Sequence, residues 1–353
     1  MQFPNIVPEE RLELSWVAPH DFESCAYTIP PLRQLARRSI RGGGLNGYNT
    51  PAMQNRQKVL IIVGPTSSGK SALAVELAKR SDGEVISADS RQVYRGLNIG
   101  TGKITKREMK GVPHHLLDIA SPKKSFSADN FVKRGRAAIE DMSSRGKLPI
   151  VAGGTGFYID ALMGRIALPN VAPNKKLRLQ LEKKSAAELY KILKKKDPRR
   201  ATTIEPHHKR RLIRALEIAA ALGHVPRTEV KPRYDVLWVG IAPPLRHLEK
   251  KISARLSARM RQGMVAEAKR LHKGGLSYKR MEELGLEYRS LARLLQGITT
   301  RKQMAEELQS AIRRYAIRQI RYWKRNKGIV WFRTGAGERI PRLVRSWLRK
   351  REE

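Results

Sequence analysis

Cysteine is almost absent from this chain, since only Cys25 among its 353 residues carries a thiol. A single cysteine excludes an internal disulfide bond and any zinc site built on several cysteines. No apolar run approaches the ~18 residues that a membrane-spanning helix needs. The N-terminus, MQFPNIVPEERLEL, has proline and glutamate where a signal peptide would have a basic and then an apolar segment. These absences predict a protein of the reducing cytoplasm that has no membrane as a partner.

Acidic residues are also scarce, with 32 Asp and Glu against 71 Lys and Arg, so the formal net charge is +39. Such an excess predicts a polyanionic partner, because basic side chains that neutralise phosphates release bound counterions. Nucleic acid is the partner that we favour. A basic but merely solvated surface and an anionic membrane surface are the alternatives.

The first 56 residues differ from the rest of the chain. They hold scattered prolines, a GGG run at 42–44 and no sustained apolar period. We interpret residues 1–56 as a poorly ordered N-terminal extension. Two alternatives are a misassigned start site, since Met53 stands just before the first clear strand, and an RNA-binding arm that carries Arg33, Arg37, Arg38 and Arg41.

Short apolar segments alternate with helical segments from residue 58 onward. Lys58–Val63 is apolar and β-branched and ends at Gly64 and Pro65, which predicts a buried parallel strand. Ser71–Arg80 has the apolar spacing of a helix. Further strands are expected at Glu84–Ala88, Leu148–Ala152, Val236–Ile241 and Ile329–Phe332. The predicted fold is therefore α/β, with a parallel sheet of the P-loop type.

The character of the sequence changes between residues 169 and 232. Strand signals vanish there and lysine-rich helical stretches replace them. We predict an inserted all-helical domain at 169–232 that binds RNA. The catalytic core would then consist of residues 57–168 and 233–345, with basic helices in its C-terminal half.

One motif carries a specific chemistry. A strand precedes it, a helix follows it, and its eight residues match the phosphate-binding P-loop: Gly64, Pro65, Thr66, Ser67, Ser68, Gly69, Lys70 and Ser71. The glycines let backbone N–H groups converge on phosphate oxygens, and the helix N-terminus adds partial positive charge. Lys70 is expected to reach the terminal phosphate and Ser71 to bind Mg²⁺. The motif alone does not say which diphosphate or triphosphate binds.

Two polar residues follow neighbouring strands of the predicted sheet. Asp89 comes directly after the second strand, and Thr155 follows the third strand within a GGTG run. Residues just past the carboxyl ends of parallel strands face the ligand crevice. Asp89 is therefore a candidate Mg²⁺ ligand or general base, and Thr155 a candidate substrate contact. The alternatives are a helix-capping carboxylate and an ordinary strand-to-helix turn.

With these residues, the chain resembles the bacterial tRNA dimethylallyltransferases, also called tRNA isopentenyltransferases, over residues 57–333. The resemblance lies in an ordered series of segments: GPTSSGKS at 64–71, ISADSRQVYRGLNIGTGK at 86–103, PHHLLDI at 113–119, SADNF at 127–131, GKLPIVAGGTGFYIDAL at 146–162, DP at 197–198, RLIRALE at 211–217, IAPPLRHLEKKISARLSARM at 241–260 and RRYAIRQIRYWKR at 313–325. DSRQVYRGLNIGTGK and GGTGFY are far more specific than the P-loop.

The resemblance implies a reaction. The P-loop would hold dimethylallyl diphosphate, the N6 amine of the adenosine 3′ to the anticodon would attack the allylic carbon, and pyrophosphate would leave. Asp89 would take the N6 proton and Thr155 would touch the reacting end of the adenosine. Lys70, Arg255 and Mg²⁺ on Ser71 would balance the charge that develops on pyrophosphate.

The resemblance also implies tRNA contacts, at Asp89, Ser90, Arg91, Gln92, Thr155, Arg178, Arg210, Arg211, Arg214, Tyr288 and Arg289. The sequence departs from the family pattern at several positions: Ile317 stands where lysine is common and Tyr322 where tryptophan is common. LGLEYR at 284–289 replaces a shorter pattern. These departures concern tRNA contacts more than catalysis.

Two rival enzymes share part of the pattern. A P-loop kinase would explain residues 64–71 but would need neither GGTGFY nor so basic a helical half. An isopentenyltransferase that acts on free adenylate would not need the ~60 residues of basic insertion. A non-catalytic RNA-binding module would leave the P-loop, Asp89 and Thr155 unexplained. We therefore predict a monomeric tRNA dimethylallyltransferase.

Overall fold

The computed structural model of this chain describes residues 56–227, 232–333 and 336–349. The predicted N-terminal extension, apart from Arg56, and the single Cys25 lie outside the described residues.

The centre of the molecule is a parallel sheet with the strand order β3-β2-β4-β1-β5-β6. Its strands are β1 (Lys58–Val63), β2 (Gly83–Ala88), β3 (His114–His115), β4 (Leu148–Gly153), β5 (Asp235–Ile241) and β6 (Ile329–Phe332). The α/β fold and the five predicted strands are confirmed, with bounds that shift by at most one residue. The two-residue edge strand β3 carries too short a pattern to be predicted.

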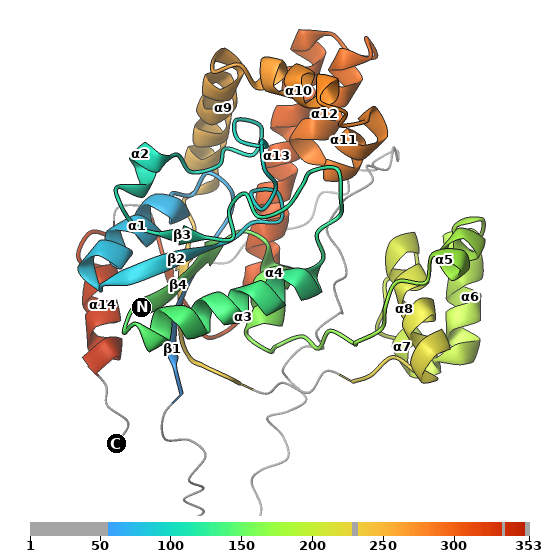
Figure 1. The fold of residues 1–353 in the computed structure, drawn as a ribbon, viewed down its shortest axis with the longest axis horizontal. Coiled ribbons are helices and arrows are strands. Elements are labelled where there is room, and N and C mark those ends of the chain that lie inside the picture. The colour runs from blue at the N-terminus through green and yellow to red at the C-terminus, as the bar shows by residue number, and fades with distance from the viewer. Residues whose placement is uncertain (1–55, 228–231, 334–335, 350–353) are drawn as a thin grey trace, which may run out of the picture.

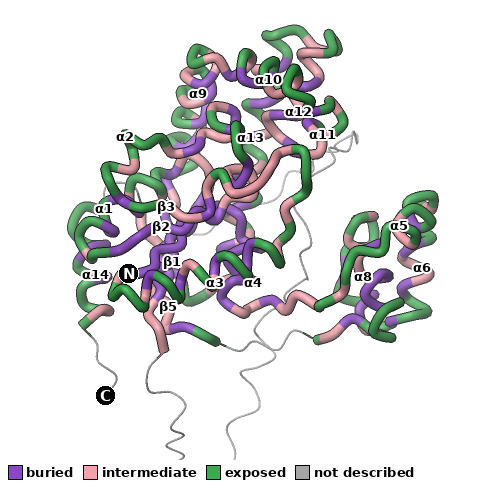
Figure 2. Tube along the Cα trace, in the orientation of Figure 1, coloured by how far each residue is buried: buried purple, intermediate pink, exposed green. Residues whose placement is uncertain are grey.

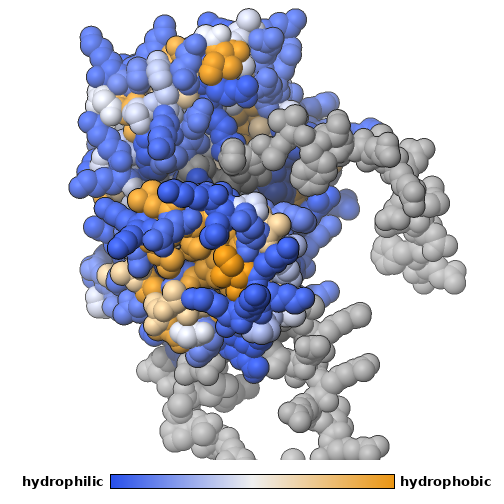
Figure 3. Space-filling model, turned by 90° about the vertical axis from the view of Figure 1, so that its right-hand side faces the viewer, coloured by the Kyte–Doolittle hydropathy of each residue, from blue (hydrophilic) through white to orange (hydrophobic). Residues whose placement is uncertain are grey.

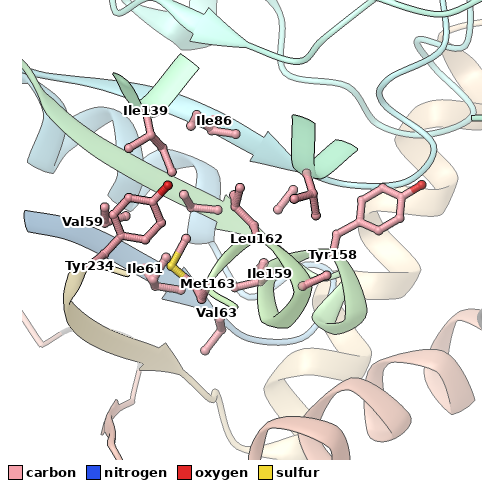
Figure 4. Close-up of a cluster of buried hydrophobic side chains, with 14 of the residues drawn as sticks. Val59, Ile61, Val63, Ile86, Ile139, Tyr158, Ile159, Leu162, Met163 and Tyr234 are labelled. Atoms are coloured by element: carbon pink, nitrogen blue, oxygen red, sulfur yellow. The ribbon is translucent and has the colours of Figure 1, made fainter. Parts of the chain in front are cut away.

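Side chains alternate between the two faces of the sheet, as the pleat requires. On β1, Leu60 and Ile62 point into one core, whereas Val59, Ile61 and Val63 point into the other. Figure 4 shows this second core, where the β1 side chains lie against Ile159 and Leu162. All five β1 side chains are fully buried, which explains why the strand reads as a continuous apolar run.

Helices cover both faces of the sheet (Figure 1). α1 (Lys70–Arg80) and α14 (Arg339–Arg349) contribute to the core on one face. The core on the other face includes side chains from α3 (Ala128–Ser144), α4 (Gly156–Leu162) and α13 (Arg301–Trp323). The short helix α2 (Lys106–Met109) precedes β3.

A second helical layer follows β5. It consists of α9 (Leu245–Arg261), α10 (Met264–Lys273), α11 (Tyr278–Leu284), α12 (Leu286–Leu295) and one side of α13. Its core also takes in Val93, Tyr94 and Leu97 from the segment after β2. The basic C-terminal helices are therefore packed against the loop that carries Asp89.

Four helices lie between α4 and β5 in the described residues: α5 (Lys175–Glu182), α6 (Ala186–Lys196), α7 (Pro198–Ala201) and α8 (Lys209–Leu222). They form a unit beside the sheet, with buried positions along the inner side of α8 (Figure 2). Leu189, Leu193, Leu212 and Leu216 lie in a core of their own. Figure 3 views the molecule from this side, and hydrophilic side chains cover most of it around smaller apolar areas.

Within the described ranges, we find no helix whose length and apolar character would let it cross a bilayer.

Because α5–α8 have a core of their own, we expect a cavity there to loosen these helices without loosening the sheet. Leu189 is fully buried, so Leu189→Ala should cost about 2–5 kcal/mol of local stability. Hydrogen exchange should speed up in residues 175–222 and stay unchanged in β1. The control is Leu179→Ala, because the Leu179 side chain is 69% exposed. Faster exchange throughout the sheet in Leu189→Ala would contradict this prediction.

Candidate active site

Three loops meet at the carboxyl ends of β1, β2 and β4, which are neighbours in the sheet. They open into a cleft of about 1260 Å³ whose walls also include residues of α8, α9, α12 and α13. Small-molecule sites have volumes of roughly 300–1,000 Å³. The cleft therefore has room for more than one small ligand.

The loop after β1 has the backbone geometry of a phosphate cradle. Gly64 has φ 149°, and a Cβ added there would lie 2.3 Å from the carbonyl oxygen of Ile241. Gly69 has φ 95° and precedes α1 directly. Thr66, Ser67, Ser68, Gly69, Lys70 and Ser71 line the cleft, whereas Gly64 and Pro65 are buried behind it. The first N–H groups of α1 thus open toward the cleft, where an anion can accept from them.

Lys70 is the one cation among residues 64–71, and its surroundings shift its pKa. Its Nζ donates to the carbonyl oxygen of Pro65 at 2.5 Å. Burial away from water, and next the charge of Arg255, lower the pKa of Lys70 to about 7, although Asp89 acts in the opposite direction. A bound anion would restore the charge of this lysine.

Asp89 lies directly after β2 and lines the same cleft. Its Oδ1 accepts from the N–H groups of Arg91 at 2.8 Å and Gln92 at 3.3 Å. One carboxylate oxygen therefore caps a turn, but no helix begins at Asp89, so the helix-capping alternative is not what the structure shows. Asp89 also raises the pKa values of both Lys70 and Arg255, so it lies close to both cations.

Thr155 joins the loop after β4 to the loop after β2. Its Oγ1 accepts from the N–H of Ser90 at 3.1 Å, and its own N–H donates to the carbonyl oxygen of Ala88 at 3.2 Å. The residue is only 4% exposed but borders the cleft. A Cβ at Gly153 would lie 2.1 Å from the carbonyl oxygen of Ala88, so glycine is needed for this close approach.

Arg255 of α9 reaches the cleft from the second helical layer. Its Nη2 donates to the carbonyl oxygen of Gly102 at 2.8 Å. Burial, and next the charge of Arg259, lower the pKa of Arg255 from its ordinary value. The loop that holds Gly102 is fixed by the buried Glu267, whose carboxylate accepts backbone N–H groups from Asn98 at 3.1 Å, Ile99 at 2.8 Å and Gly100 at 2.9 Å.

The predicted arginines of the insertion line the cleft, but two of them share one buried carboxylate. Arg178 donates to both carboxylate oxygens of Glu217, at 2.9 and 2.8 Å, and Arg214 also pairs with Glu217. The Glu217 side chain is only 1% exposed, so Arg178 and Arg214 neutralise a buried charge. Arg211 pairs with the exposed Glu205 at 3.1 Å, and Arg210 is exposed.

One predicted tRNA contact needs correction. Tyr288 is 1% exposed and lies in the core of the second helical layer, where its hydroxyl donates to Glu267 at 2.7 Å. A side chain buried in this way does not present its ring to RNA in this structure. The neighbouring Arg289 borders the cleft, as do Ser90, Arg91 and Gln92.

One face of α13 borders the cleft but carries no predicted role. Ile312, Tyr315, Gln319 and Tyr322 recur at helical spacing on this face and all border the cleft. The signal is present in residues 312–325 of the sequence, because residues three and four apart share a helix face. That periodicity does not tell a cleft wall from an ordinary core face.

Among the residues that the structure describes, no group of three or more His, Cys, Asp or Glu side chains could hold a metal ion. Ser71 is exposed at the start of α1 and borders the cleft beside Lys70.

The model of the family described as IPP transferase matches residues 92–326 of this chain. Two bacterial proteins named tRNA dimethylallyltransferase are similar to it. That of Anoxybacillus flavithermus is 39% identical over 282 residues, which cover 78% of this chain and 90% of the relative. That of Leuconostoc citreum is 40% identical over 296 residues, which cover 82% of this chain and 99% of the relative.

Solved structures resemble the fold as well. The tRNA isopentenylpyrophosphate transferase of Bacillus halodurans superposes with a TM-score of 0.62 at 34% identity, covering 83% of this chain and 94% of that one. A eukaryotic dimethylallyltransferase solved in action on tRNA gives a TM-score of 0.72 at 26% identity, covering 82% of this chain and 78% of that one.

The lowered pKa of Lys70 predicts a pH-dependent affinity for inorganic pyrophosphate. The anion raises the pKa of Lys70, so binding above about pH 7 must take up a proton. Once the ionisation of pyrophosphate itself is subtracted, affinity should be level below about pH 7 and fall up to about tenfold per pH unit above it. Calorimetry in two buffers of different ionisation enthalpy measures this proton uptake.

Lys70→Ala is the control, because it removes the titrating group. It should bind pyrophosphate more weakly and without this proton uptake. Equal uptake by the wild type and by Lys70→Ala would contradict the assignment.

Proposed function

This chain belongs to the IPP transferase family, and we infer from that membership and from its cleft that it prenylates transfer RNA. The donor that we propose is dimethylallyl diphosphate, and the acceptor is N6 of the adenosine on the 3′ side of the anticodon. The observation that carries the proposal is that the P-loop, Asp89 and Thr155 border one cleft together with basic residues of the helical insertion. A phosphate-binding loop alone would fit many enzymes.

In the proposed reaction, the N6 lone pair forms a bond to the allylic carbon. The bond between that carbon and the diphosphate oxygen breaks, and pyrophosphate leaves with the electron pair. Asp89 accepts the proton that N6 must lose. It lies close to Lys70 and Arg255, the two cations that would face the departing pyrophosphate.

Fixed cations would stabilise the leaving group. Lys70 and Arg255 both border the cleft and both lose hydration by burial, so their interaction with an anion is strong. Mg²⁺ fits the site through the Ser71 hydroxyl, because this ion takes few protein ligands and completes its shell with phosphate oxygens and water. When bound, it would neutralise further charge on pyrophosphate.

The adenosine has to leave its stack to reach this cleft. We propose that Thr155 touches the reacting end of the base, since this residue borders the cleft and its hydroxyl accepts from Ser90, next to Asp89. Ser90, Arg91, Gln92 and Arg289 border the cleft as further candidate contacts. We also propose that the chain acts as a monomer in the cytoplasm, which analytical ultracentrifugation and cell fractionation would test.

One assay separates this function from its rivals. Labelled dimethylallyl diphosphate is offered with tRNA, with AMP, or with neither. We expect label to enter tRNA alone. Label in AMP would indicate an adenylate isopentenyltransferase, and phosphorylation of an acceptor by ATP without prenyl transfer would indicate a kinase.

Asp89→Asn should keep both substrates bound and lose most of the rate. The amide retains an Oδ1 that accepts from Arg91 and Gln92, so the turn should persist. A general base contributes about 10²–10⁴-fold, which sets the expected loss in single-turnover rate. Asp82→Asn is the matched control, because Asp82 is exposed and precedes β2 at its opposite end. A wild-type rate in Asp89→Asn would rule out the base.

Arg210 and Arg211 are the insertion arginines to test, because Arg178 and Arg214 neutralise buried Glu217. Changing Arg210 and Arg211 together to Ala should weaken tRNA binding and make its dependence on log[salt] shallower by about two. Pyrophosphate affinity should not change. The control is the double change of exposed Lys194 and Lys195 to Ala, which removes equal charge from α6 outside the cleft. If both double variants weakened tRNA binding equally, net charge alone would explain the effect, and the position of Arg210 and Arg211 at the cleft would not matter.

A further inference from the structure

Helix α13 sends one buried amide between the two loops of the active site. Gln319 is 5% exposed, and its Oε1 accepts from the backbone N–H of Thr66 in the P-loop at 2.8 Å. Its Nε2 donates to the carbonyl oxygen of Gly154 at 3.0 Å. The same carboxamide therefore binds the loop after β1 and the loop after β4.

The connection continues to the proposed base. Thr155 follows Gly154, and its Oγ1 accepts from the N–H of Ser90, the residue next to Asp89. These hydrogen bonds, together with the peptide bond between Gly154 and Thr155, thus link the P-loop through Gln319 to the loop after β2. The donor end and the acceptor end of the cleft are fixed relative to each other by this chain.

The two hydrogen bonds of Gln319 restrict which side chain can stand at position 319 and which can stand at position 154. A carboxamide both donates and accepts, whereas an ionised carboxylate only accepts and an apolar side chain does neither. A Cβ at Gly154 would lie 2.1 Å from Nε2 of Gln319. One turn further along α13, the Tyr322 hydroxyl donates to Asp160 at 2.5 Å, so α13 binds the β4–α4 segment at two points.

We propose that Gln319 is a positioning residue for prenyl transfer, which aligns the diphosphate in the P-loop with the adenosine held near Thr155 and Asp89. The proposal rests on the function inferred above. Gln319 acts through the two loops and not on the reacting atoms. A misplacement of about 1 Å can cost about 10²-fold in rate, so the effect belongs to the rate of transfer and not to the affinities.

The test compares Gln319→Met and Gln319→Glu with the wild type. Met fills a similar volume without hydrogen bonds, and Glu keeps the shape but loses the donor. We expect the single-turnover rate at saturating dimethylallyl diphosphate and tRNA to fall about 10- to 100-fold in both variants. The dissociation constants for pyrophosphate and tRNA should stay within about twofold of the wild type. Gln309→Met is the matched control, because Gln309 is exposed on the same helix.

A purely structural role makes a different prediction. If Gln319 only filled space, Gln319→Met would transfer at the wild-type rate, which would overturn the proposal. Parallel losses of rate and of both affinities, together with a lower melting temperature, would also overturn it.

A second measurement does not depend on activity. Hydrogen exchange in the peptide that contains Thr66 should be faster in Gln319→Met than in the wild type and in Gln309→Met. Unchanged exchange would mean that the bridge does not hold the P-loop, which would overturn the proposal. Failure of the wild type to prenylate tRNA would instead refute the proposed function. The exchange measurement would still test whether Gln319 holds the P-loop.

Discussion

The parallel alignment of β2, β4 and β1 is the constraint on which the site depends. These strands are neighbours in the sheet, so the loops at their carboxyl ends meet at one edge. The ends of β2 and β4 approach each other so closely that only glycine fits at position 153, where a Cβ would collide with the backbone of Ala88. Lys70, Asp89 and Thr155 come from three distant parts of the sequence, and this edge brings them to one cleft.

The electrostatics of the cleft favour an anionic ligand. Burial lowers the pKa of both Lys70 and Arg255, and a nearby positive charge lowers each pKa further. Elsewhere the protein compensates buried charge with protein partners: Glu217 holds two arginines, and Glu267 accepts three backbone N–H groups. At the P-loop, the compensating charge would come with the diphosphate.

Much of the fold and the centre of the site could be predicted from the sequence. The buried strands are recognisable because their apolar runs are short and end at glycine or polar residues, and the P-loop is a local motif with a local geometry. Tyr288 could not be placed, because its burial depends on helices packed around it from distant segments. The structural roles of Arg178 and Arg214 depend on Glu217, and no sequence pattern distinguishes an arginine that neutralises a buried carboxylate from one that meets RNA. Gln319 was missed because its partners, Thr66 and Gly154, are far away in sequence.

We propose that one cleft holds dimethylallyl diphosphate beside an adenosine of tRNA, in loops whose relative positions are fixed, so that the dimethylallyl group passes to the adenosine and pyrophosphate leaves. The most direct measurement is mass spectrometry of tRNA after incubation with the protein and isotopically labelled dimethylallyl diphosphate, with nuclease fragments that locate the label. The account predicts one labelled dimethylallyl group on the adenosine that follows the anticodon on its 3′ side. Unlabelled tRNA, or label at nucleotides outside the anticodon loop, would contradict it.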